Sequence, residues 1–321
     1  MKKVIIDPRE TYPGSGVDLV CGEYYQNRRQ YPHTGLVVEG QDVGYERYRD
    51  KYPDFPFVDK VTDVDVSLVF FEAGRAEKYV PADPESDELV VFIHGGGWWA
   101  GAVDRYRYVC KYIARTFKRV TYSIDYDLAP EFVYPHQVEQ ISAVIDELCR
   151  DGKKIILFGD SAGGNLALAE TLKQKEHPDR VKAQILYYPC VTMSGSYDEG
   201  WDIERYEETG EFERSLIGRL RPAKGIMAPY YCREEDREDP YVSPLCMKDH
   251  SFYPKTIFCL AGLDYLRLQG EDLAKRLDEE GVDVTLLIYK GIAHGFFDRL
   301  YYFWQAEDSI QRVYEAYLAS E

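Results

Sequence analysis

The chain has 321 residues, of which 45% are hydrophobic, so it can bury a full core as one large α/β domain with insertions. Its 39 basic and 56 acidic side chains give a net charge of −17, which argues against nucleic acid and anionic membranes as partners. Seven cysteines without a CxxC pair predict reduced thiols, and the lack of a signal-peptide core or long apolar span predicts a cytoplasmic protein.

Apolar runs of strand length alternate with segments of helical spacing from residue 63 onward. The predicted strands are 64–70, 89–93, 120–124, 154–158, 183–188, 256–260 and 282–289. The predicted helices are 105–117, 137–149, 165–175, 270–280 and about 300–318. This alternation predicts an α/β fold with a mostly parallel sheet and helices on both faces.

Two segments interrupt the pattern. Residues 1 to about 60 are rich in Tyr, Pro, Gly and charge, and predict irregular structure with one short helix near 45–52. Residues from about 191 to 245 break the alternation of strands and helices. We expect the two segments to form a cap on a single domain that spans 1–321.

A nucleophile is predicted at Ser161, within Gly159-Asp-Ser-Ala-Gly163. An apolar strand precedes this G-x-S-x-G pattern and a helix follows it, which is the setting of a nucleophile elbow. The two glycines suit a backbone too tight for side chains. The N–H of Ala162 would then lie free at a helix N-terminus, where negative charge is stabilised. The alternative is a glycine-rich turn that only caps a helix.

A second glycine-rich loop, His94-Gly-Gly-Gly97, follows the buried strand 89–93. Acyl transfer builds an alkoxide that N–H donors stabilise, and glycines let a loop turn its N–H groups towards a ligand. We therefore predict an oxyanion hole made by Gly95, Gly96 and Ala162. A phosphate-binding loop is the alternative, but neither Gly-Lys-Ser/Thr nor G-x-G-x-x-G is present.

The residues around these glycines have expected roles of their own. His94 is expected to hold the loop in shape through hydrogen bonds and not to transfer protons. Trp98 and Trp99 are predicted to contact substrate, where their bulk would leave room for a short acyl group only.

The acid and the base are predicted at Asp264 and His294, each of which follows a strand late in the chain. Open α/β sheets gather their chemistry at the carboxyl ends of strands, and hydrolases of this kind present Ser, acid and His in that order. His294 would take the proton of Ser161, and Asp264 would orient the imidazole. Two rival acids lie on the wrong side of the last strand or too near the histidine: Asp283 and Asp298. Without His/Cys clusters at ligand spacing, no metal or cofactor is expected.

In order and spacing, these residues resemble the motifs of hormone-sensitive-lipase-like (bacterial family IV) carboxylesterases of the α/β-hydrolase superfamily. The resemblance covers about 65 to 318, and the matching motifs are His94-Gly-Gly-Gly97, Tyr126-Asp-Leu-Ala-Pro-Glu131, Gly159-Asp-Ser-Ala-Gly-Gly164, Ser243-Pro-Leu245, Asp264 and His294-Gly-Phe296. It implies an eight-stranded α/β-hydrolase sheet with a cap, no cofactor, and hydrolysis of short to medium carboxylic esters through an acyl-serine.

Three positions depart from the family's motifs. Asp127 stands where the family has Arg, which removes a structural ion pair. In the acid motif, Tyr265 stands where the family has Pro and Leu268 where it has a second Asp. Trp98 also resembles the loop of arylformamidases, so an amidase or arylformamidase is one alternative. A non-catalytic ligand-binding protein on the same fold is another. The expected partner is a small-molecule ester, taken by a monomer or a homodimer.

Overall fold

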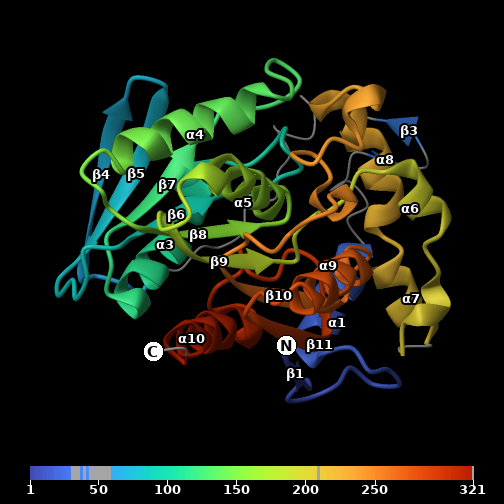
Figure 1. The fold of residues 1–321 in the computed structure, drawn as a ribbon. Helices are drawn as coiled ribbons and strands as arrows, with labels where there is room; N and C mark the ends of the chain where they lie inside the picture. The colour runs from blue at the N-terminus through green and yellow to red at the C-terminus, as the bar shows by residue number, and fades with distance from the viewer. Residues whose placement is uncertain (30–36, 39–40, 43–58, 208–209, 320–321) are drawn as a thin grey trace.

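A nine-stranded sheet forms the centre of the computed structural model, which describes residues 1–29, 37–38, 41–42, 59–207 and 210–319 (Figure 1). The strand order is β1-β11-β10-β9-β8-β6-β7-β5-β4. These strands are β1 (Lys2–Ile6), β4 (Val64–Phe71), β5 (Gly74–Pro81), β6 (Leu89–Ile93), β7 (Thr121–Asp125), β8 (Ile155–Asp160), β9 (Val181–Tyr187), β10 (Lys255–Leu263) and β11 (Val284–Ala293). A separate antiparallel pair joins β2 (Val37–Val38) and β3 (Gln41–Asp42).

Parallel pairing holds from β1 through β7, while β5 runs antiparallel to β7 and β4 antiparallel to β5. Every residue of β6 and of β8 is buried, as expected for continuous apolar strands that are covered on both faces. The register pairs Ile93 with Gly159, so the ends of β6 and β8 lie side by side. The two predicted glycine-rich loops therefore leave the sheet next to each other.

Helices cover both faces of the sheet. The α-helices are α1 (Leu19–Arg29), α3 (Val103–Phe117), α4 (His136–Leu148), α5 (Ala162–Lys173), α6 (Gly195–Glu199), α7 (Glu211–Ile217), α8 (Leu220–Tyr231), α9 (Arg267–Glu279) and α10 (Trp304–Leu318). The core on one face includes α3 and α10, and the core on the other includes α4, α5 and α9. None of the described helices is long and apolar enough to cross a membrane.

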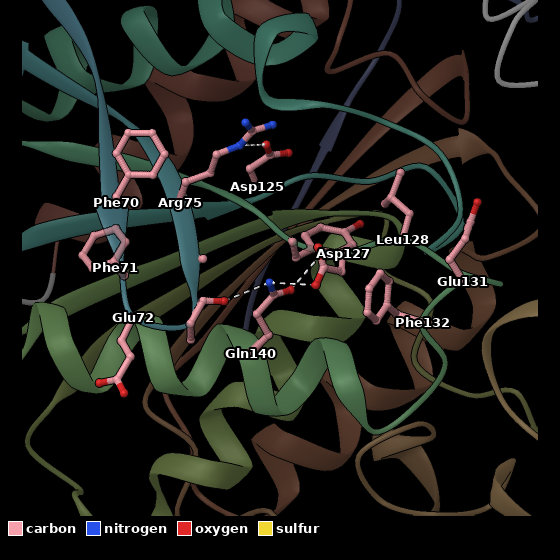
Figure 2. A pocket seen from close by; sticks show the side chains of 13 residues that line it. Phe70, Phe71, Glu72, Arg75, Asp125, Asp127, Leu128, Glu131, Phe132 and Gln140 are labelled. Atoms are coloured by element: carbon pink, nitrogen blue, oxygen red, sulfur yellow. Dashed lines mark hydrogen bonds and ion pairs between the residues drawn. The ribbon is translucent and has the colours of Figure 1, made fainter.

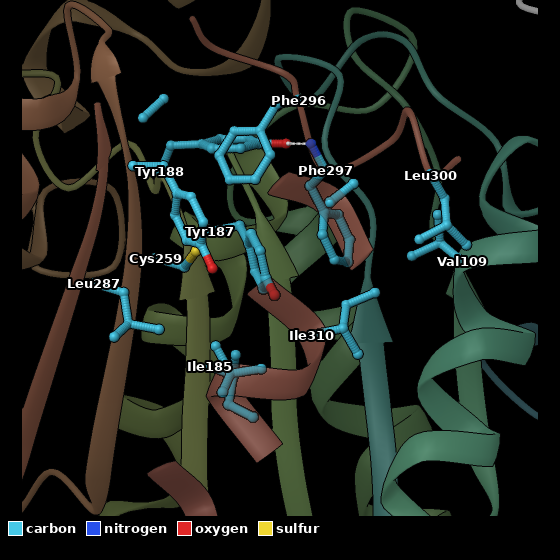
Figure 3. Packing of buried hydrophobic residues seen from close by; sticks show 14 of the residues in the cluster. Val109, Ile185, Tyr187, Tyr188, Cys259, Leu287, Phe296, Phe297, Leu300 and Ile310 are labelled. Carbon is cyan, nitrogen blue, oxygen red and sulfur yellow. Dashed lines mark hydrogen bonds between the residues drawn. The ribbon is translucent and has the colours of Figure 1, made fainter. Parts of the chain in front are cut away.

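Side chains of β9 show how the two cores divide. Ile185 and Tyr187 belong to the core that contains α3 and α10, whereas Leu186 between them belongs to the other core. Figure 3 shows Ile185 and Tyr187 in one cluster with Val109 of α3 and Ile310 of α10. This alternation follows from the two-residue period of a strand.

The predicted fold class is confirmed, with one more strand than the expected eight. Two strands of the sheet are not among those predicted, β5 and β1, of which β1 pairs in parallel with β11 at the sheet edge. The sequence of β1 has too few apolar residues to be recognised, and of its side chains only that of Ile6 is fully buried. The expectation of irregular structure over residues 1–60 is therefore wrong for β1 and for α1, while the predicted helix near 45–52 lies outside the described residues.

The insertion between β9 and β10 holds α6, α7 and α8. In Figure 1 these three helices lie beyond the carboxyl ends of β8 and β9, to which the arrowheads of both strands point. The segment 191–245 thus sits over the sheet edge where the predicted site residues leave their strands.

Candidate active site

Ser161 occupies a tight turn between β8 and α5, with φ 55° and ψ −117°. A positive φ is unfavourable for a residue with a side chain and persists only where the surroundings enforce it. The N–H of Ser161 donates to the carbonyl of Tyr187 at 2.9 Å. A Cβ at Gly163 would lie 2.0 Å from the carbonyl oxygen of Ile93, and one at Gly159 would lie 2.4 Å from that of Gly163. Both glycines are therefore required for this turn.

The structure brings together the three residues predicted as nucleophile, base and acid. His294 Nε2 lies 3.0 Å from Ser161 Oγ, and His294 Nδ1 lies 2.7 Å from Asp264 Oδ2. Because a carboxylate accepts the Nδ1 hydrogen, Nε2 is left with a lone pair that faces the serine hydroxyl. The second oxygen of Asp264 accepts the N–H of Leu266 at 3.0 Å. The acid side chain is fully buried and the imidazole is 19% exposed.

Aromatic packing fixes the loop that carries His294. The Tyr188 ring lies 4.5 Å from the imidazole, and its hydroxyl accepts the N–H of Phe297 at 3.2 Å (Figure 3). The Phe297 ring packs against Tyr187 of β9 at 4.1 Å. The histidine loop is thus held to the end of β9, the strand whose Tyr187 carbonyl also accepts the N–H of Ser161.

The oxyanion loop differs from the prediction at one residue. The N–H of Gly95 already donates to Asp160 Oδ1 at 2.7 Å, so Gly95 does not fit the predicted role of oxyanion donor. Gly96 and Gly97 have φ of 120° and 64°, and their N–H groups form no hydrogen bond with any described residue. Ala162, as predicted, is the first residue of α5, where an N–H has no partner within the helix.

Asp160 is a site residue that sequence reasoning missed. Besides the Gly95 N–H it accepts the Tyr106 hydroxyl at 3.0 Å. Burial, helped by the charge of Asp298, raises the pKa of this carboxyl from 3.8 to about 7. A carboxyl at the buried end of an apolar strand was the available signal, because such a group must find hydrogen-bond donors nearby.

His94 has the structural role that was expected of it. Its Nδ1 donates to the carbonyl of Gly95 at 2.8 Å, and its own carbonyl accepts the Tyr126 hydroxyl at 2.9 Å. Burial lowers the pKa of His94, which favours the neutral form of the ring. The imidazole stacks on the Tyr126 ring at 4.3 Å, a contact that helps to fix the shape of the loop.

Both tryptophans of the loop are buried, Trp98 to 2% and Trp99 to 1% exposure. The Trp98 indole stacks on Tyr231 with a centroid distance of 4.5 Å and an interplanar angle of 10°. Their contact with substrate stays a prediction. Neither rival acid contacts the imidazole: Asp298 pairs with Arg105 at 2.6 Å and Asp283 with Lys255 at 3.6 Å.

Asp127, which stands where the family has Arg, accepts hydrogen bonds from two residues of α4. His136 Nε2 donates to its carboxylate at 2.8 Å and Gln140 Nε2 does so at 3.1 Å. Asp127 and Gln140 line a hollow of about 670 Å³ between the β4–β5 hairpin and α4, where Phe70 is also exposed (Figure 2). Ser161, His294 and Asp264 do not line this hollow, which is therefore separate from the candidate active site.

Comparison with known proteins gives one family. The model of a family described as alpha/beta hydrolase fold matches residues 90–298. An arylesterase of Saccharolobus solfataricus is 31% identical over 225 residues, which cover 68% of this chain and 71% of that protein. An ethyl acetate hydrolase of Pseudomonas putida is 26% identical over 307 residues, covering 90% and 88%. The solved structure of an esterase from Pyrobaculum calidifontis superimposes with a TM-score of 0.68 at 26% identity, covering 82% of this chain and 86% of that one.

Proposed function

Since this chain belongs to the alpha/beta hydrolase fold family, we propose that it is a carboxylesterase whose reaction runs through an acyl-enzyme on Ser161. The observation that carries the proposal is the unbroken chain of contacts from Ser161 Oγ through His294 to Asp264, at 3.0 and 2.7 Å. The ester hydrolases named among its relatives support the choice of substrate class.

Acylation begins when His294 Nε2 takes the proton of Ser161 and Oγ attacks the ester carbonyl carbon. The tetrahedral alkoxide collapses, and the imidazolium gives its proton to the departing alcohol. Water then attacks the acyl-serine, with His294 again as the base. Asp264 stabilises the imidazolium in both steps through its contact with Nδ1.

The alkoxide is stabilised by backbone N–H groups. The donors are Gly96, Gly97 and Ala162, because the N–H of Gly95 is engaged by Asp160. Loss of one such donor costs roughly 10²–10³ in rate, so this loop supplies a large part of the catalysis.

The preferred substrates are short-acyl or acetyl esters. The predicted contact of Trp98 and Trp99 with the acyl chain favours a short pocket, and one relative is named for ethyl acetate. A series of p-nitrophenyl esters from acetate to decanoate, assayed with the wild type and Ser161→Ala, tests this. We expect kcat/KM to fall with chain length and the variant to be inactive, whereas a preference for decanoate would contradict the short pocket. N-formylkynurenine beside phenyl acetate separates the arylformamidase alternative.

The setting of the enzyme is also part of the proposal. Its cap is formed by residues 191–245 together with the part of 1–60 that follows β1, because β1 is an edge strand of the sheet. The enzyme works in the cytoplasm on small molecules, as a monomer or a homodimer, without nucleic acid or membrane. The net charge of −17 and the seven free cysteines, six of them buried, support this setting. A tagged copy found outside the cytoplasm would contradict the location, and native mass spectrometry decides the assembly.

A further inference from the structure

The oxyanion loop is strained at Trp98, whose φ is 65°. An aromatic residue rarely adopts a left-handed conformation and keeps it only where contacts enforce it. Two contacts do so here. The N–H of Ala129 donates to the Trp98 carbonyl at 2.9 Å, and the indole lies flat on Tyr231, with both rings at 2% exposure or less.

Tyr231 reaches Trp98 from the insertion, as the last residue of α8. Its carbonyl accepts the N–H of Tyr134 at 2.8 Å, which ties the end of the helix to the loop after β7. Its hydroxyl is buried and has no hydrogen-bond partner among the described residues. What Tyr231 supplies to the oxyanion loop is therefore the flat face of its ring and not its hydroxyl.

The acid loop is held from the same insertion by Tyr206, which is 4% exposed. The Tyr206 hydroxyl donates to the carbonyl of Asp264 at 2.7 Å and to that of Tyr265 at 3.2 Å. These carbonyls flank the backbone from which the Asp264 carboxylate extends to His294. Tyr206 therefore contacts the acid loop through its hydroxyl, whereas Tyr231 contacts the oxyanion loop through its ring.

Tyr265, which replaces the family's Pro, strengthens the same junction. Its hydroxyl donates to Asp198 of α6 at 2.5 Å, and its ring packs against Trp201 at 5.0 Å. The substitution thus gives the acid loop a side chain that packs into the insertion, where a proline could form no hydrogen bond.

We propose that Tyr206 and Tyr231 are positioning residues, through which the insertion 191–245 holds the acid loop and the oxyanion loop in their working geometry. The insertion is then part of the catalytic apparatus as well as a cover over it. This inference rests on the proposed function, because it assigns a purpose to contacts with the two loops that the esterase mechanism uses.

The two tyrosines predict opposite responses to the same substitutions. Tyr206→Phe removes the hydroxyl that holds Asp264, so we expect kcat for p-nitrophenyl acetate to fall about tenfold to a hundredfold, the scale of a small misplacement of a catalytic group. Tyr231→Phe keeps the stacked ring and should retain the wild-type rate within about twofold, since the missing hydroxyl had no partner. Tyr231→Leu removes the flat ring and should lower kcat by about tenfold or more.

Further readouts separate positioning from a general loss of structure. All rates are taken per titrated active serine, well below each variant's Tm, and KM should change by no more than about twofold. Tyr206→Phe should shift the acid limb of the pH profile of kcat/KM, because Asp264, which the Tyr206 hydroxyl holds in place, stabilises the protonated form of His294. Tyr231→Leu should leave that limb in place and weaken inhibition by a boronic acid, whose tetrahedral adduct occupies the oxyanion hole. Tyr241→Leu is the matched control, since Tyr241 lies in the same insertion and contacts Lys173.

The outcomes are distinguishable. Wild-type rates and pH profiles in both Tyr206→Phe and Tyr231→Leu, together with an inactive Ser161→Ala, would overturn the positioning roles and leave the esterase intact. Equal damage from Tyr231→Phe and Tyr231→Leu would overturn the role of the stacked ring. An active Ser161→Ala would instead remove the proposed function on which the inference rests.

Discussion

At the scale of single residues, the pKa values of two buried carboxyls, Asp160 and Asp298, are shifted in opposite directions. Burial and the charge of Asp298 raise the pKa of Asp160 to about 7. Burial also disfavours the charged form of Asp298, but Arg299 and Arg105 outweigh it and lower the pKa of Asp298. The Asp160 carboxyl holds its proton more tightly in the folded chain than in the unfolded one. Its contribution to stability therefore declines as pH rises from about 4 to about 7.

The decline of this contribution with rising pH leads to a prediction for Asp160→Asn. The amide keeps an oxygen to accept the Gly95 N–H but does not ionise. Between pH 5 and 6.5 the variant should gain stability relative to the wild type by about 1.4 kcal/mol per pH unit, measured by urea unfolding at several pH values. Asp151→Asn, at an exposed turn, is the control. A difference between wild type and Asp160→Asn that does not change with pH would contradict the raised pKa.

At the scale of elements, the site depends on how closely α5 approaches the ends of β6 and β8. A Cβ at Gly163 would overlap the backbone carbonyls of Ile93 and His94 at 2.0 and 2.6 Å. No side chain can move to relieve such an overlap, because both neighbours are backbone. The start of α5, and with it the Ala162 N–H, would have to shift away from the oxyanion loop.

Gly163→Ala is therefore expected to lower both activity and stability. We predict a loss of about 1–3 kcal/mol in the free energy of unfolding, the range of an overpacked core site. The kcat should fall more than tenfold, as for a lost oxyanion donor. Gly195→Ala is the control, because a Cβ there has no atom within 4 Å. The kcat is measured by stopped assay and the free energy of unfolding by urea titration. Similar kcat values for the two variants would contradict this explanation of the turn at Ser161.

At the scale of the whole molecule, the sequence predicts a strand where its apolar residues form a pattern. It does not predict a strand whose formation depends on pairing with neighbouring strands. The continuous apolar run 89–93 predicts its strand to the residue. In contrast, β5 has the sequence GRAEKYVP and buries Glu77, so no apolar pattern reveals it. Its strand character comes from pairing on one side with β4 and on the other with β7.

The same distinction applies to the site. Ser161, Asp264 and His294 could be predicted because each stands in a motif at a strand end, and the structure brings them within hydrogen-bonding distance. The predicted role of Gly95 failed because its N–H is taken by Asp160, a contact set by the register of β6 on β8. Tyr206 and Tyr231 belong to no motif, and only the folding of the insertion onto the two loops reveals them.

The most direct test of the account is covalent labelling of the native protein with a fluorophosphonate, followed by peptide mass spectrometry. Because His294 activates Ser161 alone, we expect one label per chain on the peptide that contains Ser161. Labelling of His294→Ala should be slower by about 10³ or more, as expected when a base of the triad is lost. A label on another serine, or continued ester hydrolysis by a protein that takes up no label, would contradict the proposed triad.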